Sequence, residues 1–368
     1  MIALVGHCRA GFEPEAAVDF ERIAGTARVA PTLDAPTSRG FVVATLEVEP
    51  AALVSALEKS APIFVRSLFV GLGPWRLFEG APPPGMKRPD RVAALVPLLA
   101  PLARALPRSL RAPYGELRIE MPDTNDGKAL SGLCRALAEP LSDALRERRM
   151  LDADADIMRP TLHVLFADGA TAYVGASAAP WRSAWPMGIV RLRMPHAAPS
   201  RATLKLAEAF ATFLGDDEPR LLGGGMKAVD LGAAPGGWTW QLAHRGVRVT
   251  AVDNGTLKGE VASDPLVTHV RGDGLTYRPR RPVDWMVCDI VEQPARIAAL
   301  VARWLAHGDA RRSIFNLKLP MKRRYDEVLR CNATIRDALT RAGVRHTVAF
   351  RQLYHDREEV TGYAARTD

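Results

Sequence analysis

The last part of the chain alternates short apolar runs with amphipathic stretches. Runs rich in Val, Ile and Leu predict buried strands, and apolar residues recurring every three or four positions predict helices. The expected strands lie at 228–233, 247–253, 267–271, 283–289 and 313–317, and the expected helices at 238–245, 294–307 and 322–342. This regular order predicts a doubly wound, Rossmann-like parallel sheet. Two later runs, at 344–353 and 360–365, predict an antiparallel hairpin on the edge of that sheet.

The first half mixes strands and helices over shorter distances, which is typical of small α+β domains. Residues 1–80 show strand patterns at 1–5, 40–47 and 63–71 and helix patterns at 12–24 and 51–59. A proline-rich segment at 81–89 is typical of a linker. Residues 90–199 then show strand patterns at 115–121, 161–166 and 170–175, a turn at 122–127 and a helix at 132–149. The chain is thus predicted to hold three domains, at 1–80, 90–199 and 200–368.

The sharpest motif is the small-residue turn in Val229-Asp-Leu-Gly-Ala-Ala-Pro-Gly-Gly-Trp-Thr-Trp240. Gly232, Gly236 and Gly237 allow a positive φ and a close approach of backbone to a ligand. A dinucleotide fingerprint would need glycine where Ala234 stands, which disfavours a pyrophosphate cradle. Together with Pro235, the turn suits a cofactor without phosphates, such as S-adenosylmethionine. A plain glycine-rich turn is the alternative.

Acidic residues follow the next two strands. Asp253 ends the second strand, where an acid can accept hydrogen bonds from ribose hydroxyls. Asp273 follows the third strand, where an acid could meet an adenine amino group. An isolated Asp in such a place is more often a turn residue, so its role rests on its place in the series.

Charged residues are expected to meet where the parallel strands end, because ligands of open α/β sheets bind there. Asp289 ends the fourth strand and Lys318 the fifth. The last strand should run antiparallel, which brings Glu358 or Glu359 to the same edge. We favour Glu359, since it directly precedes the strand, and Lys205 lies on a preceding helix that can pack over this edge.

Lys205, Asp289, Lys318 and Glu359 resemble the Lys-Asp-Lys-Glu tetrad of the FtsJ-type ribose 2′-O-methyltransferases. The segments Ser200-Arg-Ala-Thr-Leu-Lys205, Val287-Cys-Asp289, Asn316-Leu-Lys-Leu-Pro320 and Arg357-Glu-Glu-Val360 match its four elements in order. Residues 8–16, 123–125, 187–192, 315–321 and 351–360 extend the likeness, over nearly the whole chain, to a family of large-subunit ribosomal RNA methyltransferases. Ala202 departs from the pattern, since relatives are expected to carry serine there.

The resemblance implies a ferredoxin-like domain, a THUMP domain that binds RNA, and a Rossmann-like methyltransferase domain. It implies S-adenosylmethionine-dependent 2′-O-methylation of one cytidine in the peptidyl-transferase region of 23S rRNA. The rRNA, or a precursor of the large subunit, would be the partner. The expected cofactor-binding residues are Ser200, Gly232, Ala234, Pro235, Gly236, Gly237, Trp238, Asp253, Asp273 and Asp289. Trp238 and Trp240 more often pack a core than stack on bases.

The chemistry explains these residue types. The enzyme must align an in-line attack on an activated methyl group and remove the 2′-hydroxyl proton. A lysine can be the base only when neutral; a second lysine favours that form, whereas the acids oppose it. We hypothesise that Lys318 is the base, that Asp289 orients it, and that Lys205 and Glu359 position the ribose and balance charge.

Composition narrows the remaining choices. A net charge of +8 over 368 residues favours a polyanionic partner, although a basic surface alone would explain it as well. The cysteines, Cys8, Cys134, Cys288 and Cys331, show no metal-ligand spacing, so we expect reduced thiols and no metal. No apolar run approaches the roughly 20 residues of a membrane span. We therefore expect a cytoplasmic protein that binds no membrane; the oligomeric state stays open.

Three other functions fit the sequence less well. A THUMP-containing nucleobase methyltransferase would favour Asn-Pro-Pro-Tyr or Asp-Pro-Pro-Tyr after the fourth strand, where this chain has Asp289-Ile-Val-Glu292. A non-catalytic RNA-binding protein would not need the complete set of two lysines and two acids. An NAD-dependent dehydrogenase is disfavoured by Ala234.

Overall fold

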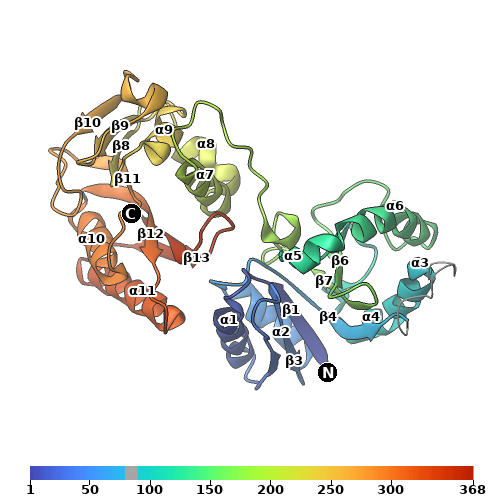
Figure 1. The fold of residues 1–368 in the computed structure, drawn as a ribbon. Helices are drawn as coiled ribbons and strands as arrows, with labels where there is room; N and C mark the ends of the chain where they lie inside the picture. Colours follow the sequence, from blue (N-terminus) through green and yellow to red (C-terminus); the bar gives the residue numbers. More distant parts are fainter. Residues whose placement is uncertain (79–89, 368) are drawn as a thin grey trace. The chain divides into compact units, whose positions relative to one another are not determined.

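The computed structural model describes residues 1–78 and 90–367, so the linker predicted at 81–89 lies outside the described residues. The chain forms two compact units, Met1–Ile189 and Val190–Asp368. Each is built on its own seven-stranded sheet (Figure 1). Within the described ranges, none of the helices combines the length and apolar character that crossing a bilayer requires.

The sheet of the first unit runs through both of its predicted halves, in the order β2-β3-β1-β4-β7-β6-β5. Its strands are β1 Ile2–His7, β2 Thr32–Asp34, β3 Phe41–Leu46, β4 Ser67–Arg76, β5 Glu116–Glu120, β6 Thr161–Phe166 and β7 Thr171–Ser177. Its α-helices are α1 Glu13–Thr26, α2 Pro50–Glu58, α3 Arg91–Leu95, α4 Leu99–Ala105, α5 Asn125–Ala129 and α6 Ser131–Glu147. The antiparallel pairing of β4 with β7 joins the two halves. Their identity as ferredoxin-like and THUMP domains stays a prediction.

Two local predictions in this unit were wrong. The strand expected at 63–71 begins only at Ser67, because the backbone N–H groups of residues 63–65 donate to the buried carboxylate of Asp19. The turn expected at 122–127 contains the short helix α5, whose first turn is capped by the hydroxyl of Thr124. In both places a side-chain acceptor captured backbone donors, which periodicity does not reveal.

The second unit confirms the doubly wound sheet. Its order is β10-β9-β8-β11-β12-β14-β13, in which β14 alone runs opposite to the other six strands. The strands are β8 Lys227–Leu231, β9 Arg248–Val252, β10 Val267–Val270, β11 Val283–Cys288, β12 Ala310–Lys318, β13 His346–Arg351 and β14 Glu359–Arg366. The α-helices are α7 Ala202–Phe213, α8 Glu218–Leu221, α9 Gly237–Ala243, α10 Pro294–His307 and α11 Arg324–Arg341.

The strand order reverses between β8 and β11, and this reversal creates the site. Because β8 leads outward to β9 while β11 leads to β12 on the other side, right-handed crossovers put α9 and α10 on opposite faces. Phe210 of α7 and Trp238 of α9 pack with Val249 and Trp285 in the core of one face. A crevice is therefore expected beyond the carboxyl ends of β8 and β11.

Asp230 of β8 lies in the core beneath this crevice. Its Oδ2 accepts a hydrogen bond from Thr239 Oγ1 of α9 at 2.6 Å, and its Oδ1 has no hydrogen-bond partner among the described residues. Burial raises the pKa of Asp230 to about 7. The native state therefore keeps a proton that the unfolded chain loses near pH 4. Through this group, stability falls as pH rises from about 4 to about 7.

We therefore expect Asp230→Asn to gain stability relative to the parent protein as pH rises. The amide oxygen keeps the acceptor for Thr239 and carries no charge. Thermal melting at pH 5 and pH 8 measures the effect, and the difference between variant and parent should shift in favour of the variant at pH 8. Asp337→Asn, an exposed change on α11, is the control. An Asp230→Asn difference that is equal at both pH values would contradict the expectation.

Candidate active site

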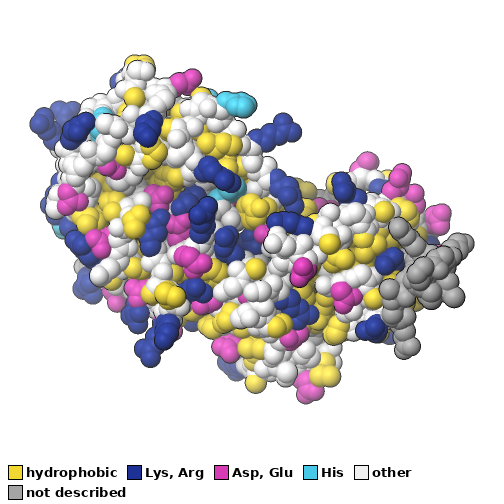
Figure 2. Space-filling view, in the orientation of Figure 1, with side chains coloured by type: hydrophobic (Ala, Val, Ile, Leu, Met, Phe, Trp, Pro, Cys, Tyr) yellow, Lys and Arg dark blue, Asp and Glu magenta, His cyan; other side chains and the backbone are white. Residues whose placement is uncertain are grey.

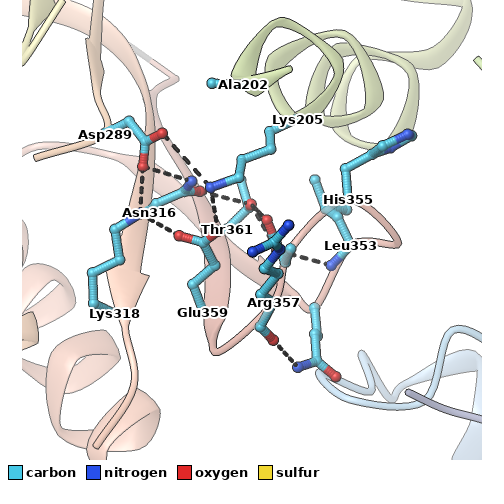
Figure 3. Close-up of polar contacts among 12 residues, drawn as sticks. Ala202, Lys205, Asp289, Asn316, Lys318, Leu353, His355, Arg357, Glu359 and Thr361 are labelled. Atoms are coloured by element: carbon cyan, nitrogen blue, oxygen red, sulfur yellow. Dashed lines mark hydrogen bonds and ion pairs between the residues drawn. The ribbon is translucent and has the colours of Figure 1, made fainter. Parts of the chain in front are cut away.

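The structure brings the four predicted charged residues together at the carboxyl edge of the second sheet (Figure 3). Lys318 Nζ lies 2.6 Å from Asp289 Oδ1 and also pairs with Glu359 Oε2. Lys205, from α7, pairs with Glu359 Oε1 and lies 3.7 Å from Asp289 Oδ2. Two cations thus share two carboxylates. We call this group the charged tetrad.

Strand pairing explains why the tetrad assembles. β14 inserts antiparallel between β12 and β13, so that its first residue, Glu359, is in register with Lys318, the last residue of β12. Glu358 lies elsewhere: its side chain is 66% exposed and pairs with Arg324 at 3.0 Å. Of the two glutamates left open by the sequence, the structure places Glu359 in the site.

The carboxylates set the charge state of the tetrad. Burial alone would lower the pKa of Lys318, but Asp289 and Glu359 outweigh it and hold that pKa above its ordinary value. Burial alone would raise the pKa of Glu359, but Lys318 and Lys205 hold it below its ordinary value. Lys318 is therefore an ammonium and Glu359 a carboxylate in this arrangement. From the sequence, a second lysine was expected to favour the neutral form of Lys318 and the acids to oppose it. In the structure, the effect of the acids prevails.

Behind the tetrad lies a buried polar chain that the sequence reasoning missed. Asn316 Nδ2 donates to Asp289 Oδ1 at 3.0 Å, and Asn316 Oδ1 accepts from Thr361 Oγ1 at 2.8 Å. The hydroxyl of Thr361 also lies 3.1 Å from Asp356 Oδ1. All three side chains are fully buried. One signal was available: Asn316 and Thr361 each lie two residues from a tetrad member along a strand, hence on the same face.

Asp356 gives this chain a direction. Burial, and then the charge of Glu359, hold the pKa of Asp356 well above its ordinary value, which favours the neutral acid. Its proton can be donated to Thr361 Oγ1. Because a hydroxyl carries a single proton, Thr361 then donates to Asn316, and Asn316 donates to Asp289. The chain orients the Asp289 carboxylate toward Lys318.

The glycine turn packs closely against the residues around it. Gly232 and Gly236 adopt φ values of +78° and +114°, as predicted for a turn of this kind. A Cβ atom added at Gly236 would lie 2.6 Å from Val261, and one at Gly237 2.4 Å from Ser200 Oγ. A Cβ atom at Gly232 would lie 2.7 Å from Ile290, the residue after Asp289. The turn and the tetrad are therefore neighbours.

Polar groups surround this turn. Ser200 Oγ is buried and has no hydrogen-bond partner within the part of the chain that the structure describes. Asp253 Oδ2 accepts from the backbone N–H of Ala234 at 3.0 Å, and its Oδ1 accepts from Gly255 N at 2.7 Å. Each oxygen of Asp253 retains a second lone pair for a ligand hydroxyl. The carboxylate of Asp253 is thereby tied to the turn that it would serve.

Two other predicted residues are placed less favourably. Asp273 is exposed, and its Oδ1 accepts from Leu275 N at 2.9 Å, which is the arrangement of a turn residue. The indole of Trp238 is buried in the core and donates to the carbonyl of Ala202 at 3.1 Å. Only the backbone of Trp238 is thus available to a ligand. Ala202 itself contributes no hydroxyl.

Among the described residues, no group of three or more His, Cys, Asp or Glu side chains is placed to hold a metal ion. Cys8, Cys134, Cys288 and Cys331 are free and buried. Burial raises the pKa of Cys288, next to Asp289, to about 12, so its thiol is not a nucleophile at neutral pH.

Known proteins share the sequence of both units. Residues 198–339 match the family model described as FtsJ-like methyltransferase. Residues 90–178 match the one described as "Ribosomal RNA large subunit methyltransferase M, N-terminal". A protein of Cellvibrio japonicus named ribosomal RNA large subunit methyltransferase M is 45% identical over 97% of this chain and 97% of its own length. The protein of that name from Aromatoleum aromaticum is 46% identical over 98% of this chain and 94% of its own length.

A third relative of the same name, from Edwardsiella ictaluri, is 42% identical over 100% of this chain and 94% of its own length. The likeness therefore covers the whole chain, including the sheet edge that carries the tetrad. This chain belongs to the ribosomal RNA large subunit methyltransferase M family, and its second unit is an FtsJ-like methyltransferase domain.

Proposed function

We propose that this chain transfers the methyl group of S-adenosylmethionine to the ribose 2′-hydroxyl of one cytidine in the peptidyl-transferase region of 23S rRNA. The observation that carries the proposal is the charged tetrad, with Lys318 Nζ 2.6 Å from Asp289 Oδ1, beside the glycine turn. The family supports methylation of large-subunit rRNA. The choice of the ribose over a nucleobase as the methyl acceptor rests on two points. A lysine is available as the general base, and the chain resembles FtsJ-type enzymes.

The residues present fit the cofactor. Gly232, Ala234, Pro235, Gly236 and Gly237 would line it with backbone, since a side chain at any of the three glycines would collide with neighbouring protein atoms and displace the turn. The unpaired Ser200 Oγ offers it a polar contact, and Asp253 would accept from its ribose hydroxyls. Asp273, Asp289 and the backbone of Trp238 complete the proposed set. When bound, S-adenosylmethionine supplies a methyl group on a positively charged sulfur.

Lys318 is the proposed base, and its raised pKa defines what the site must do. The ammonium has to release a proton before its Nζ can accept one from the 2′-hydroxyl. A further positive charge bound at the glycine turn would repel the Lys318 ammonium and lower its pKa, opposing the effect of the two carboxylates. The pairing with Asp289 holds Nζ on the side of the glycine turn, while Lys205 and Glu359 position the ribose.

Lys318→Met is expected to lower kcat by about 10²–10⁴-fold, which is the usual contribution of a general base. Affinities for S-adenosylmethionine and RNA should change little, because the glycine turn is untouched. Lys322→Met, an exposed lysine in the same chain segment, is the matched control and should keep its kcat.

The assay follows methyl transfer to 23S rRNA and locates the mark by resistance to alkaline cleavage, which requires a free 2′-hydroxyl. Isothermal titration with S-adenosylmethionine checks that both variants bind cofactor. Methylation by Lys318→Met at the rate of the parent protein would refute the role of Lys318. A mark on a base, with an alkali-sensitive backbone, would refute ribose methylation.

The buried polar chain generates a second expectation. Thr361→Val keeps the shape but removes the hydroxyl between Asp356 and Asn316, whereas Thr361→Ser keeps the hydroxyl. A lost neutral hydrogen bond of about 0.5–1.5 kcal/mol corresponds to a two- to tenfold loss in kcat for Thr361→Val. Steady-state kinetics should show this loss with unchanged KM values, and recovery in Thr361→Ser. If Thr361→Val and Thr361→Ser lose kcat equally, the hydroxyl of Thr361 does not act by ordering the hydrogen bonds of the buried polar chain.

A further inference from the structure

A cavity lies on the opposite edge of the same sheet from the charged tetrad. It has a volume of about 440 Å³ and is lined by the first residues of β8, β9 and β11, by Leu266 and Thr268 at β10, and by the segment 277–281. Its floor includes Val229 and Thr250, which are register partners on neighbouring strands. We call it the amino-edge groove.

The groove exists because a helix is missing. A connection from β10 across to β11 would ordinarily carry a helix that covers this part of the sheet. Residues 271–282 instead cross as an irregular segment. This segment is anchored to α10: Arg303 donates to the carbonyl of Leu275 at 2.9 Å, and the ring of Tyr277 stacks on Trp304 with 6.5 Å between centroids. One wall of the groove is therefore preformed.

The walls carry four cationic side chains that form no ion pair with the residues that the structure describes. Lys227 and Arg248, register partners on β8 and β9, line the groove together with Arg280 and Arg281. Within residues 1–78 and 90–367, none of these four makes an ion pair. By contrast, Arg245 pairs with Glu218, and Arg296 with Glu292. Asp284 lies close by, but its Oδ2 accepts from the backbone N–H of Lys227 at 2.9 Å.

Overall basicity does not mark a path for RNA, because Lys and Arg side chains are scattered among carboxylates over the face drawn in Figure 2. The amino-edge groove differs in gathering four cations around one cavity. Like charges that face one another on adjacent strands destabilise a sheet. The position of Lys227 opposite Arg248 is explained if an anion neutralises the two side chains in the working state.

We propose that the amino-edge groove binds phosphodiester groups of the RNA substrate, at a distance from the nucleotide that is methylated. This inference rests on the proposed function, because the occupant is the same RNA. A single phosphate would not engage four cations, and the exposed Arg271 and Arg278 extend the basic segment beyond the cavity. Strands of five residues put the two edges about 17 Å apart, a distance that several nucleotides can span.

A charge-matched pair of double variants tests the proposal in the full chain. Arg280→Ala with Arg281→Ala removes two groove cations, whereas Arg341→Ala with Arg345→Ala removes two exposed cations near the end of α11. The probe is a labelled 23S rRNA fragment, and its dissociation constant is measured over a series of NaCl concentrations. The slope of log K against log salt counts the phosphates contacted.

The groove variant should reduce that slope by about one to two, and the control should leave it unchanged. KM for RNA should rise in the groove variant while kcat at saturating RNA and the affinity for S-adenosylmethionine stay at parental values. Equal slopes in the two double variants would overturn the proposal. A second result would also overturn it: the groove variant alone loses binding of CMP, while its salt slope for RNA equals that of the parent protein. The groove would then hold a free nucleotide.

The readout also separates this proposal from the proposed function. If the parent protein binds the fragment without methylating it, the proposed function fails, yet the salt slopes still decide whether phosphodiesters occupy the groove.

Discussion

The site depends on the sharing of two carboxylates, those of the half-buried Asp289 and the buried Glu359, by two lysines at the ends of β11, β12 and β14. Charges removed from water are tolerated only when they are paired, and Glu359, with 6% of its side chain exposed, could not be ionised there without Lys205 and Lys318. The antiparallel insertion of β14 provides this compensation by bringing Glu359 into register with Lys318. The same pairing holds the proposed base protonated, so stability and catalysis make opposite demands on Lys318.

Neighbouring acids in this unit take different roles because their surroundings differ. Glu359 faces two ammonium groups, which hold its pKa low, while Asp356 and Asp230 face hydroxyls and apolar surface, and burial raises the pKa of each. A neutral Asp356 can donate a hydrogen bond, and this fixes the direction of the chain that ends on Asp289. Within this unit, Glu359 thus serves as a counter-ion, Asp356 as a hydrogen-bond donor and Asp230 as a core residue.

The two edges of the second sheet differ in what they offer to RNA. At the carboxyl edge, two lysines and two carboxylates balance one another's charge beside the glycine turn, which suits chemistry at one nucleotide. The amino edge carries uncompensated cations over a cavity left by the absent crossover helix, which suits binding to backbone phosphates. Methylation of one nucleotide in a large RNA needs both a reacting site and contacts that hold the rest of the strand in place.

Sequence periodicity by itself determined most of the second unit. It placed α10 at its observed bounds and the first five strands to within a few residues, because apolar runs mark buried strands and a three- to four-residue apolar period marks the buried face of a helix. The glycine turn and the charged residues at the strand ends could also be read directly, since parallel strands bring their carboxyl ends to one edge. The resemblance to FtsJ-type enzymes supplied roles for those residues that spacing alone could not.

Only the tertiary structure decided between Glu358 and Glu359, because adjacent residues on a strand point to opposite sides and the register of β14 selects one of them. It alone revealed the buried polar chain through Asn316, Thr361 and Asp356, because the hydrogen-bond partners are distant in sequence. It also revealed that the backbone N–H groups of residues 63–65 donate to Asp19. It also exposed the amino-edge groove, whose cations come from three separate segments. Hydrophobic patterning specifies which face of an element is buried, whereas side-chain partners depend on how those elements pack together.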